Sequence, residues 1–192
     1  MSTPEEVLKF WLDDCEPMDW YRVDEELDAT IRDRFEPVWN KAKGGGLGQW
    51  MAYASGCLAY VILTDQFSRN MFRGTGKAFA SDFCARAVAK QAISKGWDMR
   101  IDMPARQFFY TPLLHSENLC DQDRCVRLMK ERLGSSGESL LHAKAHRQVI
   151  RDFGRFPYRN EALGRKNTAA EDAYLANGGY GFTVQGLQAQ AA

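Results

Sequence analysis

Residues 50–63 read WMAYASGCLAYVIL and form the most apolar stretch of the chain. A helix that is apolar on almost every side is buried, because no face of it is suited to water. A bilayer-spanning helix needs about 20 apolar residues, and this stretch is shorter and contains a serine and a glycine. We therefore expect residues 49–67 to form the central helix of a globular core.

The segments on either side carry further helical patterns. Residues 3–6 (TPEE) combine a capping threonine, a proline in the first turn and a glutamate at the third position, which is typical of a helix start. Along residues 24–42, apolar residues recur at spacings of four and three, the stripe of an amphipathic helix that Pro37 is expected to kink or shorten. Three glycines at residues 44–46 predict a break. The remaining expected helices are residues 78–95, 104–117, 121–133, 136–153 and 168–176.

We find no convincing strand pattern in the sequence. Helices of similar length joined by glycine-marked turns predict an all-α fold. We expect about eight helices in antiparallel hairpins, arranged as a tetratricopeptide-like or bundle-like array. This gives one helical domain over residues 1–182, while the chain from Gly178 onward is expected to form a tail that is flexible over residues 183–192.

The composition limits the classes of partner. The 192 residues are 45% hydrophobic and 26% charged, which is ordinary for one globular domain. Acidic and basic residues number 25 each, so the formal net charge is zero. Nucleic acids and anionic membranes attract proteins through excess positive charge. We therefore expect neither as a partner.

The cysteines and the N-terminus indicate the compartment. The chain has five cysteines, an odd number, and none of them forms a Cys-x-x-Cys pair. This predicts reduced, mostly buried thiols in a reducing compartment. Residues 1–10 include Glu5 and Glu6 and lack the basic start and long apolar run of a signal peptide. We therefore expect a cytoplasmic protein.

An Arg-Asn-x-x-x-Gly element occurs twice, at residues 69–74 and 159–164. Each copy follows an expected long helix, at a place where backbone polar groups need partners. In the first copy, Asp65 stands four residues before Arg69, which is the spacing of an ion pair on a helix. The structural interpretation is a helix end closed by this pair and a glycine.

The functional interpretation is a cationic site. Arg69, Asn70 and Arg73 would bind a carboxylate or phosphate, since a guanidinium donates two parallel hydrogen bonds from a planar fork. Arginines and aromatic residues are interleaved through residues 151–165, where Arg155, Arg159 and Asn160 are the corresponding candidates. The alternative for this second segment is a surface loop whose arginines stack on aromatic rings and cap helix carbonyls.

The histidines are the candidates for proton transfer. His115 and Glu117 follow an apolar run, so we expect them at a helix end, where a histidine beside a glutamate could act as acid or base. A histidine there could equally serve only the helix dipole. His142 and His146 have the i,i+4 spacing of metal ligands, but no nearby Cys or His supplies a third ligand. We expect no metal, assign His146 to the polar site, and find no phosphate-loop or dinucleotide motif that predicts a cofactor.

In three motifs, which contain the Arg-Asn elements and two of the histidines, the chain resembles the bacterial "domain of unknown function 924" family. The resemblance implies a helical fold similar to tetratricopeptide-like arrays and implies no established activity. The chain departs from the family pattern at Ser68, where the family has proline, and at Tyr158, where it has histidine, which argues against an essential histidine there. The resemblance rests on three motifs in order, residues 63–74 (LTDQFSRNMFRG), 114–122 (LHSENLCDQ) and 146–160 (HRQVIRDFGRFPYRN).

Three interpretations of these motifs stay open. The first is a site for a small anionic ligand, which could be enzymatic. The second is a helical-repeat module that binds an acidic peptide or a carboxylate terminus. The third is a purely structural polar network. The ligand-binding candidates are Arg69, Asn70, Arg73, Arg155, Arg159 and Asn160, and the proton-transfer candidates are His115, Glu117, His146 and Asp65.

Overall fold

The computed structural model describes residues 2–134 and 137–191, and within these ranges the chain is helical and contains no strand. The prediction of an all-α fold with helices in a bundle-like array is therefore confirmed. The chain divides into two compact units, Met1–Pro112 and Leu113–Ala192, which we call unit 1 and unit 2. Each unit is described by itself. Within the described ranges, no helix combines the length and the hydropathy needed to span a membrane.

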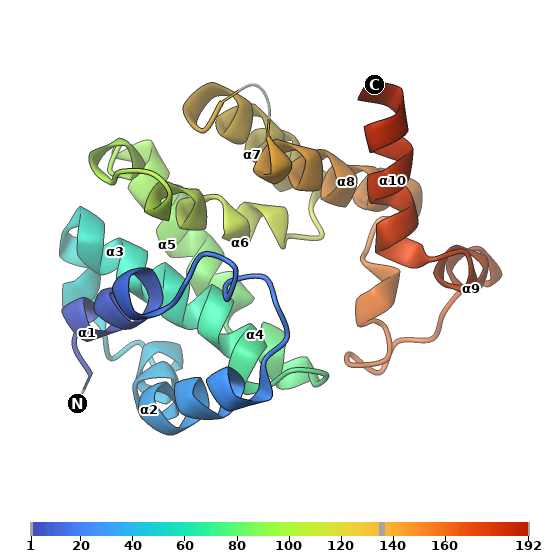
Figure 1. Ribbon diagram of the computed structural model, residues 1–192. Helices are drawn as coiled ribbons and strands as arrows, with labels where there is room; N and C mark the ends of the chain where they lie inside the picture. The colour runs from blue at the N-terminus through green and yellow to red at the C-terminus, as the bar shows by residue number, and fades with distance from the viewer. Residues whose placement is uncertain (1, 135–136, 192) are drawn as a thin grey trace. The chain divides into compact units, whose positions relative to one another are not determined.

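Unit 1 consists of α-helices joined by short π-helical and 3-10-helical segments (Figure 1). Its α-helices are α1 (Pro4–Leu8), α2 (Glu25–Lys43), α3 (Ala54–Val61), α4 (Phe67–Met71) and α5 (Asp82–Ser94), and α6 (Thr111–Leu114) begins in this unit. The π-helical segments are Lys9–Asp14 and Ile62–Gln66. The 3-10 segments are Gly48–Ala52, Gly76–Phe79, Asp98–Arg100 and Ala105–Phe109.

The first helix begins as the sequence predicts. The Thr3 side chain accepts a hydrogen bond from the Glu6 N–H, and the Glu6 carboxylate accepts one from the Thr3 N–H. This capping box satisfies two backbone donors that a helix start would otherwise leave unpaired. The short helix continues directly into the π-helical segment Lys9–Asp14.

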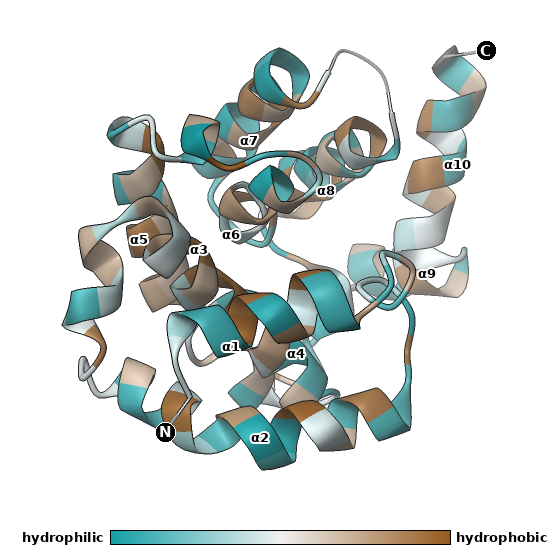
Figure 2. Ribbon diagram, turned by 60° about the vertical axis from the view of Figure 1, so that its left-hand side comes forward, coloured by the Kyte–Doolittle hydropathy of each residue, from teal (hydrophilic) through white to brown (hydrophobic). Residues whose placement is uncertain are grey.

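Helix α2 buries the predicted stripe and continues through its proline. Ile31, Phe35 and Val38 are buried, and Figure 2 shows hydrophobic and hydrophilic residues alternating along the helix. Pro37 lies inside α2, which ends only at Lys43, so the expected early end is wrong. An interior proline costs about 3 kcal/mol. Burial of apolar side chains on both sides of Pro37 offsets that cost.

Residues 56–63 of the apolar stretch are buried as expected, whereas Ala52 and Tyr53 are exposed, and the stretch is not one α-helix. The 3-10 segment Gly48–Ala52 precedes α3, and the backbone bends back so closely that a Cβ at Gly56 would lie 2.1 Å from the carbonyl oxygen of Trp50. Only glycine allows this approach, because a side-chain carbon cannot sit that near an oxygen. The helical run then widens into the π-helical segment Ile62–Gln66 before α4.

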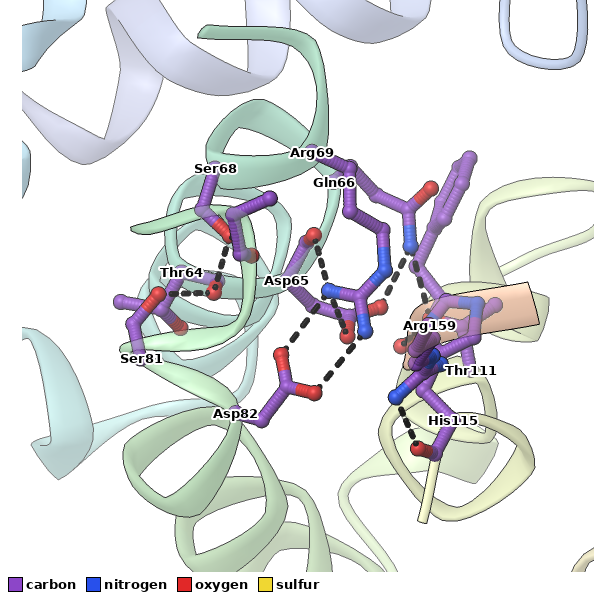
Figure 3. Close-up of polar contacts among 12 residues, drawn as sticks. Thr64, Asp65, Gln66, Ser68, Arg69, Ser81, Asp82, Thr111, His115 and Arg159 are labelled. Atoms are coloured by element: carbon purple, nitrogen blue, oxygen red, sulfur yellow. Dashed lines mark hydrogen bonds and ion pairs between the residues drawn. The ribbon is translucent and has the colours of Figure 1, made fainter. Parts of the chain in front are cut away.

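Buried hydroxyl groups join this run to its neighbours. Ser81 donates to the carbonyl of Thr64 at 2.5 Å and accepts from the indole N–H of Trp39 at 3.0 Å. Ser68 lies within hydrogen-bond distance of the carbonyls of Thr64 and Ala78 (Figure 3). These bonds satisfy polar groups that would be costly to bury alone. They fix the helical run against α2 and the segment before α5.

The expected helices 78–95 and 104–117 are both shorter than predicted. In the first, Gly76–Phe79 is a 3-10 segment and the α-helix proper is α5, which begins at Asp82. In the second, the 3-10 segment Ala105–Phe109 precedes α6, whose second residue is Pro112. Proline is tolerated in the first turn of a helix, where its missing N–H leaves no bond unmade.

Unit 2 is built on two long helices followed by shorter ones. Its elements are α7 (Leu119–Arg132), α8 (Glu138–Phe153), the 3-10 segment Pro157–Arg159, α9 (Ala169–Ala176) and α10 (Gly179–Ala191). Helix α8 packs against both α7 and α10. Gly154 ends α8 with φ 69°, a left-handed conformation that suits glycine. Thr168 and Glu171 form the predicted capping box of α9.

The C-terminal segment differs from its expected form. The chain from Gly178 onward was predicted to be a tail, whereas the structure has α10 over Gly179–Ala191. The segment carries no charged residue and has four glycines, so it lacks the amphipathic pattern that predicts a helix. The end of the predicted tail at Ala192 and the predicted start of the seventh helix at Ser136 lie outside the described residues.

Candidate functional site

In unit 1, the π-helical segment Ile62–Gln66 places Asp65 at a widened turn between α3 and α4. Single π-helical turns inside longer helices occur frequently at functional sites. The exposed fraction of Asp65 is 0%. A carboxylate at such a position is costly to bury unless it is paired, so the partners of Asp65 determine what it can do.

Arg69 is bonded to two carboxylates of unit 1. Its Nη1 lies 3.0 Å from Oδ1 of Asp65, which is the i,i+4 pair that the sequence spacing predicts. The same guanidinium donates to both carboxylate oxygens of Asp82 at 3.0 Å each, from the start of α5 (Figure 3). An anionic ligand at Arg69 would have to compete with both carboxylates.

Gln66 adds an amide to this group. Its Nε2 donates to Oδ2 of Asp65 at 2.5 Å and lies 3.1 Å from the hydroxyl oxygen of Thr111. Both oxygens of Asp65 therefore have hydrogen-bond or ion-pair partners. We call Asp65, Gln66, Arg69 and Asp82 the Asp65 cluster. Its bonds hold the π-helical segment against the start of α5.

The rest of the first Arg-Asn element binds α2. The carboxylate of Asp28 accepts from Nδ2 of Asn70 at 2.7 Å and from Nε and Nη2 of Arg73 at 2.7 and 2.9 Å. The hydrogen bond with Asp28 raises the pKa of Arg73 above its ordinary value. Gly74 then turns the chain with φ 78°. The first element therefore ties α4 to α2 through an almost buried carboxylate.

In unit 2, Arg155 is bonded in the same way. Its Nε and Nη2 donate to the two carboxylate oxygens of Glu171 at 2.6 and 2.7 Å, and Nη2 also donates to the carbonyl of Lys166 at 2.9 Å. Glu171 is 2% exposed. The hydrogen bond from Arg155, which outweighs the effect of burial, and the N–H of Thr168 lower the pKa of Glu171 to about 2. This pair links the end of α8 to the start of α9.

Glu117 is engaged by an arginine that sequence reasoning did not select. Arg165 donates to its two carboxylate oxygens at 2.7 and 2.9 Å, and the Phe156 N–H donates at 2.8 Å. Burial alone would raise the pKa of Glu117. The hydrogen bonds from Arg165 and Phe156 and the charges of Arg165 and Arg159 outweigh burial, so this pKa is lowered. Glu117 is therefore ionised at neutral pH, and the ionised form has no proton to donate.

Asn160 completes the same network. Its Oδ1 accepts from Nε of Arg165 at 2.8 Å, and its Nδ2 donates to the amide oxygen of Asn167 at 2.7 Å. Gly164 follows with φ 64°. The two copies of the Arg-Asn element thus share a buried asparagine whose amide donates to a side-chain oxygen and a glycine at positive φ. This likeness is one of local structure.

The three histidines of the chain all lie in unit 2. The ring centroid of His146 lies 6.2 Å from that of His115 and 4.7 Å from that of Tyr180. The Tyr180 hydroxyl lies 2.7 Å from Nδ1 of His142 and 2.9 Å from Nδ1 of His146. We call these four residues, together with Arg159, the histidine cluster. They come from four places in unit 2, namely the turn before α7, α8, the 3-10 segment and α10.

Arg159 lies against the backbone of His115 and an aromatic surface. Its Nη1 donates to the carbonyl oxygen of His115 at 3.0 Å (Figure 3). Its guanidinium carbon lies 4.5 Å from the ring centroid of Phe156, which is fully buried and stacks on Tyr158. A guanidinium over a ring face is attracted by the electrons of the ring. These contacts hold the guanidinium of Arg159, and with it a positive charge, beside the backbone of His115.

The contacts of His146 determine its tautomer. Its Nδ1 lies 2.9 Å from the backbone carbonyl oxygen of His142, which can only accept a hydrogen bond. Nδ1 therefore carries the proton, and the Tyr180 hydroxyl can donate its own proton to Nδ1 of His142. The neutral His146 ring keeps its lone pair at Nε2, which makes Nε2 the atom that can accept a proton.

The electrostatic surroundings keep His146 neutral. Burial lowers the pKa of His146 to about 3, with further lowering by His115, Arg159 and His142, although the carbonyl of His142 opposes the shift. Burial also raises the pKa of Tyr180 above its ordinary value. Shifts of this kind are common where a protein prepares groups for binding or catalysis. At neutral pH, His146 and Tyr180 therefore both lack charge.

The structure thus distributes the predicted residues over separate groups. His115, His146 and Arg159 lie together, whereas Glu117 and Asn160 meet through Arg165. In unit 1, Asp65 lies with Arg69, while Asn70 and Arg73 lie on Asp28. Their roles in ligand binding or proton transfer stay predictions. Within the described residues, no group of three or more His, Cys, Asp and Glu side chains could hold a metal ion.

Sequence reasoning did not select several residues of these groups. Tyr180 lies in the segment that was expected to be a tail, so no pattern pointed to it. Asp28 and Asp82 look like ordinary first-turn acidic residues of α2 and α5. Arg165 follows the glycine of the second Arg-Asn element directly. The place of Arg165 directly after this glycine is the one sequence signal that could have pointed to any of these four residues.

Comparisons with known proteins agree with this all-helical fold. A sequence model of the bacterial proteins of unknown function called DUF924 matches residues 7–179, so the chain belongs to this family and the resemblance of its motifs is confirmed. A solved structure of a protein of unknown function from Agrobacterium tumefaciens is 37% identical, with a TM-score of 0.84. That match covers 90% of this chain and 96% of the other. A search of curated proteins finds no match.

Proposed function

We propose that the histidine cluster of unit 2 binds a small anionic ligand and that His146 accepts a proton at Nε2 when the ligand binds. The observation that carries this proposal is that His146 lies against His115, His142 and Tyr180 at once, with the tautomer of His146 set by the carbonyl of His142. A structural role needs no such convergence. One hydrogen bond would suffice to hold each ring.

The charges of the cluster favour an anion. Arg159 and the other two histidines each disfavour a positive charge on His146. An anion placed among them would interact favourably with Arg159 and would reverse this effect, because an opposite charge nearby favours the protonated imidazole. Binding of the anion and uptake of a proton are then linked. Such linkage is a step toward acid–base catalysis.

The doubled Arg-Asn elements fit an architectural role better. Arg69, Arg73 and Arg155 each donate to both oxygens of a carboxylate of their own unit. A ligand would have to displace these bonds. Arg155 would have to leave Glu171 to grip an acidic peptide, so the peptide-binding alternative receives less support than the small-ligand site. The peptide-binding alternative predicts that the protein binds a discrete protein partner and that Arg155→Glu abolishes this binding.

The proposed site is tested by ligand-dependent thermal stabilisation with inorganic phosphate and pyruvate, each of which carries a single phosphate or carboxylate group. We expect at least one of these anions to raise Tm of the wild-type protein. The increase should be lost in Arg159→Lys and His146→Gln, and it should persist in Arg124→Lys, which changes a partly buried arginine of α7 outside the cluster. Equal stabilisation of Arg159→Lys, His146→Gln and Arg124→Lys would contradict the assignment of the site.

We also propose that the protein works in the cytoplasm. Cys15, Cys57, Cys84 and Cys120 are free thiols, and Cys120 is exposed. Free thiols with one accessible to solvent suit a reducing compartment. Fractionation of cells that express the full chain tests this proposal.

A further inference from the structure

A second feature of unit 2 lies on the hairpin of α7 and α8, which pack side by side (Figure 1). An open surface hollow of about 490 Å³ lies along the two helices. None of the residues that line it belongs to the histidine cluster. The lining residues are Asp123, Val126, Arg127, Lys130, Glu131 and Arg147. We call this hollow the α7–α8 furrow.

The helical spacing explains why these side chains face one another. Asp123, Arg127 and Lys130 follow at intervals of four and three along α7, so they lie on one face of the helix. Arg147 lines the furrow from α8, and Arg151 lies four residues further along the same helix. The furrow is therefore a product of two helical faces that the hairpin brings together.

The furrow carries an excess of positive charge. Arg147 Nη1 and Arg151 Nη2 both lie 3.3 Å from the same oxygen, Oδ1 of Asp123. One carboxylate oxygen thus serves two guanidinium groups, each through a single long contact. Within the described residues, Arg127 and Lys130 form no ion pair or hydrogen bond through their side chains and are exposed. The lining residues include three cations, Arg127, Lys130 and Arg147, and two carboxylates, Asp123 and Glu131. Arg151 adds a fourth cation beside Asp123.

The residues that line the furrow also favour a charged ligand over an apolar one. Sites for apolar small molecules are lined mainly by hydrophobic and aromatic side chains, whereas Val126 is the one apolar residue among those that line the furrow. Guanidinium groups donate parallel hydrogen bonds to the oxygens of phosphates and carboxylates. The cations are spread over both helices, so they suit a ligand that carries more than one such group.

We propose that the α7–α8 furrow binds a small polyanion, a molecule with at least two phosphate or carboxylate groups. The phosphate form and the carboxylate form share the same recognition chemistry. Pyrophosphate is the probe for a ligand with phosphate groups, and citrate is the probe for a ligand with carboxylate groups. The furrow is separate from the histidine cluster, so this inference does not depend on the function proposed above.

The test is isothermal titration of the full chain with pyrophosphate and with citrate. We expect saturable binding of at least one probe by the wild-type protein. We expect a Kd that is about tenfold higher in the double variant R127Q/K130Q, because this variant removes two exposed cations of the furrow. The matched control is R100Q/K166Q, which removes one exposed arginine and one exposed lysine elsewhere. The control should bind as the wild type does.

A third variant distinguishes binding at the furrow from binding at the histidine cluster. His146→Gln alters the histidine cluster and leaves the furrow intact, so it should retain the affinity for the probe. The inference is overturned if neither probe binds saturably, if the control loses affinity as R127Q/K130Q does, or if His146→Gln abolishes binding. It is also overturned if the furrow takes up a polyglutamate peptide and neither small probe, because the ligand would then be a protein segment.

Discussion

His146→Gln should make the folded state less sensitive to mild acid. The glutamine side chain can still reach the Tyr180 hydroxyl, but it does not titrate. In the wild-type protein, burial among His115, His142, Arg159 and Tyr180 keeps the imidazole of His146 neutral. On unfolding, the imidazole becomes solvated and regains its ordinary pKa.

The size of the effect follows from these two pKa values. The pKa of His146 is about 3 in the folded chain, against an ordinary value of 6.5. Between these values the unfolded chain binds the extra proton, so the contribution to stability is complete above pH 6.5 and declines as the pH falls toward 3. From pH 7.5 to pH 5 the wild-type protein should lose about 2 kcal/mol of unfolding free energy through this residue.

The assay is urea denaturation of wild type and His146→Gln at pH 7.5 and pH 5. His115 and His142 are present in both proteins, so the difference between the two losses isolates His146. Glu171 does not interfere, because its lowered pKa affects stability only below the ordinary value of 4.5. Equal losses in the two proteins would refute a buried, neutral His146.

Three further substitutions test the local structure, each by thermal or urea denaturation. Gly74→Ala should lower the unfolding free energy by about 1 kcal/mol, because φ is 78°, whereas Gly48→Ala, with ordinary φ and open space around it, should change little. Gly56→Ala should cost about 2 kcal/mol and lower Tm by about 4–8 °C, because its Cβ would overlap a backbone oxygen. Asp28→Asn should cost about 2 kcal/mol through its lost charge-assisted bonds, and Asp33→Asn on the exposed face of α2 should cost almost nothing.

Much of the fold could be predicted because it depends on local patterns. The stripe of Ile31, Phe35 and Val38, the capping boxes at Thr3 and Thr168, and the glycines that end helices all act within one or two turns of chain. The breaks in the helical runs were missed because they depend on how the backbone packs and not on hydrophobic periodicity. The 3-10 segment before α3 exists because the backbone packs against itself, which no periodicity reveals.

The candidate site shows the same limit. The Asp65–Arg69 pair could be predicted from its spacing, but the second carboxylate on Arg69 comes from Asp82, 13 residues further on. His142 and His146 were visible as neighbours on one face of a helix. Their shared partner Tyr180 lies 34 residues beyond His146, in a segment without a helical pattern. Tertiary packing, and not local sequence, brings the tyrosine to the histidines.

The most direct test of the central claim is proton uptake on ligand binding. The anion that stabilises the protein best is titrated calorimetrically at pH 6 in two buffers with different ionisation enthalpies. We predict that the wild-type protein takes up a substantial fraction of one proton, that His146→Gln removes this uptake, and that Arg124→Lys retains it. Binding with no proton uptake in the wild type, or the same uptake in His146→Gln, would contradict the claim that His146 accepts the proton.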